Sequence, residues 1–151
     1  MSKRFVVSVL FLLSVLCVCV AVAEGASSAK PNVEQLFAEG VAAYDAGNYA
    51  KALASFTKVA DQGYAEAQYN LGTMYMDGRG VTQDDKQAVA WYRKAADQGY
   101  AMAQYNLGVM YENGRGVAKD ERRAIEYWKM AARQGDEDAR YNLAELGVLY
   151  Y

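Results

Sequence analysis

Apolar residues recur with a helical period through most of the chain beyond residue 32. Within residues 65–77 they lie three and four positions apart, at Ala67, Leu71, Met74 and Tyr75, and this spacing predicts a helix. Gly78 follows the last of them, where a left-handed helix cap is expected. Residues 85–98 have a second such period. It predicts a second helix, with Asp84 as its N-cap.

The helical pattern is repeated along the sequence. Residues 65–100 and 101–136 align without a gap and are identical at 19 of 36 positions. Residues 137–151 begin another copy as a terminal helix, and residues 33–64 form a degenerate, shorter helix pair. A helix pair of this kind buries its apolar face only against its neighbours. The pattern therefore predicts an all-α fold, an α-solenoid of antiparallel helix pairs coiled into a right-handed superhelix.

Glycines lie inside the first helix of each full copy, at Gly72 and Gly108. A glycine in a helix interior costs about 1 kcal/mol relative to alanine. We expect a compensating close approach of the paired helix, helped by its small residues Ala88 and Ala95. The large rings of Tyr75, Trp91 and Tyr92 would fill the remaining space.

The two full copies follow one motif, A-x-A-Q-x-x-L-G-x-M-Y-x-x-G-x-G-V-x-x-D and then A-x-x-W-Y-x-x-A-A-x-Q-G. The second copy inverts the aromatic pair to Tyr127-Trp128. This motif resembles the Sel-one-like repeat family, a relative of the tetratricopeptide repeat. Residues 33–60 are more similar to an ordinary tetratricopeptide unit, with Gly40, Gly47, Tyr49, Ala52 and Phe56 at its usual spacing. The resemblance implies an α-solenoid that binds proteins or peptides, commonly as an adaptor in secretory or periplasmic assemblies.

In related solenoids the first helix of each pair lines the concave surface, which implies partner-binding residues here. They are Tyr69, Asn70, Thr73, Met76, Tyr105, Asn106, Val109, Glu112, Tyr141 and Asn142. The first unit offers Glu34, Phe37, Ala38, Val41, Tyr44 and Asp45. The recurring Tyr-Asn step would supply rigid rings and an amide suited to a peptide backbone. Alternatively, the tyrosines pack between repeats and the asparagines stabilise the repeat interface.

These positions contain no Lys or Arg, so we expect a basic or neutral, partly aromatic ligand segment. The Gly-Arg-Gly steps at 78–80 and 114–116 lack the strand before them and the Lys-Ser/Thr after them that a phosphate loop needs. We interpret them as turns from which Arg79 and Arg115 reach nearby acids or a partner. The carboxylates of Asp84, Asp85, Asp120 and Glu121 lie at helix N-termini, where capping explains them.

The last residues are apolar, namely Leu146, Val148, Leu149, Tyr150 and Tyr151. A solenoid end is usually polar. Two interpretations stay open: these residues fold back over the last repeat, or they form a docking or self-association surface.

The first segment predicts export. Lys3 and Arg4 precede an uncharged run over residues 5–23 that ends Ala21-Val22-Ala23, as in a secretory signal peptide. We expect cleavage after residue 23, a flexible leader over 24–32, no stable membrane insertion, and a bacterial periplasmic or extracellular location. An uncleaved membrane anchor is the alternative, because 19 apolar residues can just span a bilayer.

Composition narrows the function classes. The formal charge is −2, too small for an electrostatic nucleic-acid binder. The sequence has no His and both cysteines lie within the predicted signal peptide, so we predict no metal, no cofactor and no enzyme activity. The alternatives are a self-associating envelope structural protein and a cell-wall or β-lactam hydrolase. Only two observations support the hydrolase. One is the supply of carboxylates, and the other is an activity attributed to a cysteine-rich branch of the resembled family.

Overall fold

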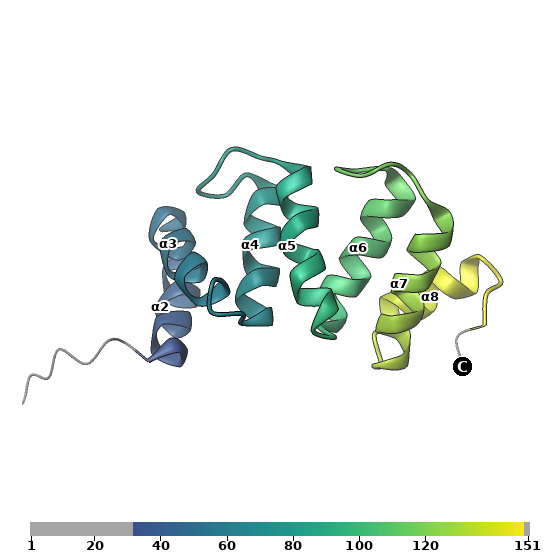
Figure 1. Cartoon of the computed structure of the whole chain (residues 1–151), viewed down its shortest axis with the longest axis horizontal. Coiled ribbons are helices and arrows are strands. Elements are labelled where there is room, and N and C mark those ends of the chain that lie inside the picture. Colours follow the sequence, from purple (N-terminus) through teal and green to yellow (C-terminus); the bar gives the residue numbers. More distant parts are fainter. Residues whose placement is uncertain (1–31, 150–151) are drawn as a thin grey trace, which may run out of the picture. The chain divides into compact units, whose positions relative to one another are not determined.

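The computed structural model describes residues 32–149, which form seven α-helices and no strand (Figure 1). The predicted signal peptide, all of the predicted leader except Asn32, and Tyr150 and Tyr151 lie outside the described residues. The helices are α2 (Val33–Asp45), α3 (Tyr49–Ala60), α4 (Ala65–Asp77), α5 (Asp85–Asp97), α6 (Ala101–Asn113), α7 (Glu121–Arg133) and α8 (Glu137–Glu145).

Consecutive helices make the main contacts. The pairs α2/α3, α4/α5 and α6/α7 pack most extensively, and α3/α4, α5/α6 and α7/α8 join each pair to the next. This nearest-neighbour packing confirms the predicted all-α solenoid of helix pairs. The handedness of its superhelix stays a prediction.

The predicted helix ends are confirmed. Gly78 and Gly114 adopt left-handed conformations with φ of 68° and 65°, and each closes the first helix of its pair. Asp84 caps α5 by accepting hydrogen bonds from the backbone N–H groups of Lys86 and Gln87 at 2.9 and 3.1 Å. The turn between α2 and α3 spans only residues 46–48, whereas the turn between α4 and α5 spans 78–84. This shorter turn distinguishes the first unit from the two full copies.

An aromatic ring lies over the helix-interior glycine of each pair. A Cβ atom at Gly72 would lie 2.5 Å from Cδ1 of Tyr92, and one at Gly40 would lie 2.7 Å from Cε1 of Phe56. Both distances are too short for any Cβ contact, so only glycine fits beneath these rings. The predicted close approach is confirmed. The group that lies closest to the glycine is an aromatic ring of the opposite helix, however, and not only the small residues of that helix.

The third pair repeats this fit with a larger ring. Trp128 lies over Gly108, and a Cβ there would collide with the indole. Tyr92 is 0% exposed and Trp128 is 1% exposed, and the two lie 36 residues apart at the same place in the repeat. The other members of the two aromatic pairs, Trp91 and Tyr127, are half-buried. Because the aromatic pair is inverted in the second copy, a tryptophan packs over its glycine where a tyrosine does so in the first copy.

A buried glutamine joins each full repeat to the unit before it. Gln104 is 5% exposed, and its Nε2 donates to the carbonyl oxygen of Ala96 at 3.2 Å. Its Oε1 accepts from Nε2 of Gln134 at 2.7 Å. The Ala96 carbonyl oxygen also accepts from the Gly99 N–H at 2.9 Å, so Gln104 adds a hydrogen bond from the next repeat at the C-terminal end of α5. Corresponding bonds join Gln68 to Ala60 and Gln98, and Arg140 to Ala132.

No helix within residues 32–149 combines the length and the apolar character needed to cross a bilayer.

We predict that Gly108→Ala destabilises the protein, although alanine is the better helix former. The added methyl group meets the Trp128 indole in a filled core, and overpacking of this kind costs about 1–3 kcal/mol. Chemical denaturation measures the free energy of unfolding.

The double-mutant cycle with Trp128→Leu provides the control. With the indole removed, Gly108→Ala should be neutral or stabilising. A Gly108→Ala penalty that is equal in both backgrounds would contradict the fit between ring and glycine.

Candidate partner-binding surface

The ten binding residues predicted from the repeats lie on α4, α6 and α8, and those that the first unit offers lie on α2. Nine of the ten are half-buried, whereas the Tyr141 side chain is 65% exposed. The structure therefore places most of these side chains partly within the packing between helices.

A groove of about 290 Å³ lies between α2 and α4. It brings together three of the residues predicted on α4, Tyr69, Asn70 and Thr73, with three of those that the first unit offers, Val41, Tyr44 and Asp45. The remaining lining residues are Phe56 and Glu66. None of the predicted residues of α6 or α8 lines it. The groove forms where the shorter first unit meets the first full repeat.

The walls of the groove are held by contacts behind them. Arg79 Nη1 donates to the Tyr44 hydroxyl at 2.6 Å, and the Tyr44 ring packs edge-on against Tyr49 at 5.3 Å between centroids. On the opposite wall, Thr73 Oγ1 lies 3.2 Å from the Tyr69 carbonyl oxygen, to which it donates. These side chains are therefore fixed before any ligand binds.

Tyr69 packs against two other rings of residues 65–100, Tyr92 on α5 and Tyr100 at the start of α6. Its ring centroid lies 5.7 Å from that of Tyr92 and 5.3 Å from that of Tyr100. Tyr105 likewise packs against the core formed around α7, which includes Trp128. Tyr141 occupies the same repeat position but is largely exposed within the described part of the chain.

Two of the three asparagines of the Tyr-Asn steps, Asn106 and Asn142, contact tyrosines of the preceding unit. Burial raises the pKa of Tyr92 to about 12, while hydrogen bonds with Thr73 and Asn106 oppose this rise. Burial also raises the pKa of Tyr105, with a further contribution from the charge of Asp138, and a hydrogen bond with Asn142 opposes it. Both asparagines thus contribute to the interface between repeats.

The remaining predicted residues also have structural contacts. The Tyr92 hydroxyl donates to Sδ of Met76 at 3.7 Å. Val109 packs against the core around α7, and Glu112 is half-buried. The structure does not bring these three residues into the groove between α2 and α4.

The two Gly-Arg-Gly steps are turns, as predicted, and their arginines bind the preceding unit. Arg115 forms two hydrogen bonds with the Asp85 carboxylate, at 2.7 and 3.3 Å. Arg79 lies 3.5 Å from an Asp77 oxygen and over the rings of Tyr44 and Tyr49. The prediction that these arginines reach nearby acids is confirmed.

Three of the four carboxylates singled out in the sequence have structural partners. Asp84 and Asp120 accept hydrogen bonds from backbone N–H groups at the starts of α5 and α7. Asp85 is the ion-pair partner of Arg115. Within residues 32–149, no group of three or more His, Cys, Asp or Glu side chains is placed to hold a metal ion.

The apolar C-terminal residues divide between the two interpretations. Val148 is half-buried against the core around α7, and its N–H donates to the Leu143 carbonyl oxygen at 2.8 Å. Leu146 and Leu149 are 40% and 67% exposed. On α8, Ala144 stands at the repeat position of Gly108. Self-association through this end stays a prediction, and Tyr150 and Tyr151 lie outside the described residues.

The Sel1 repeat family model matches residues 65–100 and 101–136. The chain contains two Sel1 repeats. The resemblance drawn from the motif is therefore confirmed. Sel1 repeats generally mediate protein–protein interactions and are generally non-catalytic.

Solved structures with the same fold include bacterial Sel1 repeat proteins. A Sel1 repeat protein from Oxalobacter formigenes is similar over 77% of this chain and 48% of its own, with 32% identity and a TM-score of 0.70. The protective antigen c5321 of uropathogenic Escherichia coli is similar over 76% and 26%, with 38% identity and a TM-score of 0.72. Helicobacter pylori cysteine rich protein B, at 22% identity, supports the fold alone, with a TM-score of 0.60.

Curated relatives match a shorter part. DAP3-binding cell death enhancer 1 of Rattus norvegicus is 46% identical over 43 residues, and the Mus musculus protein is 44% identical over the same length. These segments are 28% of this chain and 8% of each relative. The similarity is therefore limited to a repeat-sized piece of those proteins.

We predict different effects of alanine at equivalent tyrosines. Tyr69→Ala removes a ring packed against two others and should lower the free energy of unfolding by about 2–4 kcal/mol. Tyr141→Ala, at the same repeat position but exposed, should change it by less than about 0.5 kcal/mol. Thermal and chemical denaturation measure both. Equal effects would contradict the packing role assigned to Tyr69.

Proposed function

We propose that this protein is an exported, non-catalytic interaction module that binds an extended segment of a partner protein on the first-helix surface, anchored in the groove between α2 and α4. The groove is the observation that carries this proposal. Three of the residues expected from the Sel1 pattern line it, and its walls are fixed by hydrogen bonds and ring packing. A fixed wall lowers the entropy lost on binding.

The lining indicates the chemistry of the ligand. Val41 and the rings of Tyr44 and Tyr69 form apolar walls, and the groove volume of about 290 Å³ suits one large side chain. Asp45 and Glu66 contribute negative charge, and no basic side chain of residues 32–149 lines the groove. The Asn70 amide can donate to and accept from a peptide backbone. A basic or neutral segment with an apolar or aromatic anchor fits best.

The groove predicts which exposed residues control binding. Val41→Asp places a charge in the apolar wall, and Glu66→Lys reverses a charge beside it. Each should weaken partner binding by at least about tenfold without unfolding the protein. The measurement is the affinity for the major partner captured by crosslinking from envelope extract.

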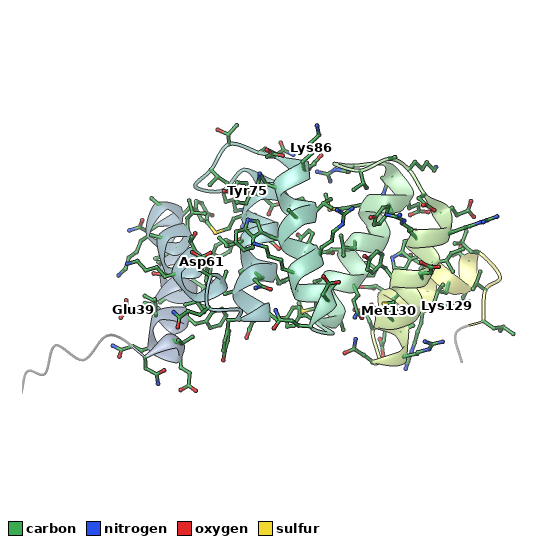
Figure 2. The ribbon with its side chains drawn as sticks, in the orientation of Figure 1. Glu39, Asp61, Tyr75, Lys86, Lys129 and Met130 are labelled. Carbon is green, nitrogen blue, oxygen red and sulfur yellow. The ribbon has the colours of Figure 1, made fainter. Side chains whose placement is uncertain are left out.

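Met130→Asp on α7, labelled in Figure 2, is the matched control. Met130 is 46% exposed and Val41 is 37% exposed. The control variant should leave the affinity unchanged. Loss of binding in the α7 variant but not in the groove variants would contradict the proposal. Alanine at Tyr69 is unsuitable here, since it disturbs packing as well as the groove.

We extend the proposal to location: residues 1–23 direct export and are then removed. The basic start, the apolar run and the Ala-Val-Ala end support this. In cells, the exported protein should begin at Glu24 by mass spectrometry. Ala23→Arg should block processing and leave the longer chain in the membrane fraction. An unprocessed wild-type chain in the membrane would favour the uncleaved anchor.

A further inference from the structure

Three basic side chains from three different segments line a second hollow, of about 260 Å³. Arg93 comes from α5, Lys119 from the turn between α6 and α7, and Arg123 from α7. Among the described residues, Asp120 is the only carboxylate that lines it. The hollow therefore has an excess of positive charge.

Tyr111 lies within this hollow and is itself 3% exposed. Its hydroxyl oxygen accepts hydrogen bonds from Nη2 of Arg93 at 2.6 Å and from Nη1 of Arg123 at 3.0 Å. Both guanidinium groups also lie over its ring, 5.8 and 5.4 Å from the centroid. The ring is stacked on that of Tyr127, with an interplanar angle of 12°. Two cations are thus held at one neutral oxygen.

The cluster is incompletely neutralised. The Nε atom of Arg123 lies 3.4 Å from an Asp120 oxygen, whereas Arg93 and Lys119 form no ion pair within residues 32–149. Burial by itself would raise the pKa of Tyr111, but the hydrogen bonds and charges of Arg123 and Arg93 lower it. The surroundings of this hydroxyl therefore favour negative charge.

The preceding repeat has the same framework without the charges. The residues 36 positions earlier are Thr57, Gln83 and Gln87, and the half-buried Tyr75 stands at the position of Tyr111. Packing between repeats consequently does not require the basic residues, because neutral side chains occupy those positions one unit away. The positive charge is specific to the junction of α5, α6 and α7.

We propose that the hollow formed by Arg93, Tyr111, Lys119 and Arg123 binds a tetrahedral oxyanion, a phosphate or sulfate group. Guanidinium groups keep further donors after each has bonded the phenol, and the Tyr111 hydroxyl keeps its own hydrogen for donation. Donors on three segments match the three or four oxygens of a tetrahedral anion better than the two of a carboxylate. This site is separate from the groove between α2 and α4, with which it shares no lining residue.

Isothermal titration of the purified protein at constant ionic strength tests the site, with inorganic phosphate, methyl phosphate, sulfate and acetate as probes. We expect saturable binding of the tetrahedral anions with a dissociation constant on the order of 1 mM, and weaker binding of acetate. Arg93→Gln and Lys119→Gln should each weaken phosphate binding by about tenfold. Arg122→Gln, an exposed change outside the hollow, is the control and should have no effect.

Circular dichroism establishes that the variants are folded, as expected for exposed side chains. Methyl phosphate binding at least as tightly as phosphate identifies an ester as the ligand, and the reverse order identifies the free ion. The proposal is overturned if phosphate heats do not saturate, if acetate binds as tightly, or if Arg93→Gln and Arg122→Gln behave alike.

Discussion

The arrangement of the helix pairs depends on one steric fit, an aromatic ring of the second helix seated over a glycine of the first. It occurs in all three pairs, with Phe56, Tyr92 and Trp128 as the rings. Each glycine lowers the intrinsic stability of its helix, and the buried ring offsets that loss. Because the ring reaches the backbone, the fit sets both the separation and the register of the paired helices. That register determines which first-helix residues face outwards.

The polar atom of the ring that lies over the glycine has different hydrogen-bond surroundings in the two full repeats. The Tyr92 hydroxyl oxygen lies 3.1 Å from Thr73 Oγ1, within hydrogen-bond distance. In the next repeat Val109 replaces that threonine, and the buried Nε1 of Trp128 has no hydrogen-bond partner among the described residues. An unsatisfied buried donor costs about 1–3 kcal/mol. The larger apolar area of the indole compensates for part of this cost.

Local features of the fold were predictable from the sequence, whereas the candidate sites depended on tertiary contacts. Helix periods, the glycine caps and the Asp84 cap involve residues a few positions apart, so the sequence pattern indicates them directly. The ring over each glycine comes from another helix. In each full repeat the sequence offers two adjacent large rings for that position, and the sequence alone does not show which one is buried. The groove arises at the junction with the shorter first unit, where the changed turn length alters the alignment. The basic hollow joins residues 111, 119 and 123 of one repeat to residue 93 of the repeat before it, which becomes their neighbour only once the repeats stack.

The repeat framework thus separates structural from adaptable positions. Glycine, the seated ring and the interfacial glutamine build each junction, while neighbouring positions vary in charge and size. At one junction this variation produces an acidic, partly aromatic groove, and at another a basic hollow. We propose the groove between α2 and α4 as the place where a partner binds. Chemical-shift mapping of the isotopically labelled protein with its captured partner tests this most directly. We expect the largest shifts on Val41, Asp45, Glu66 and Asn70. Shifts concentrated on α5 and α7, with the groove residues unchanged, would contradict it.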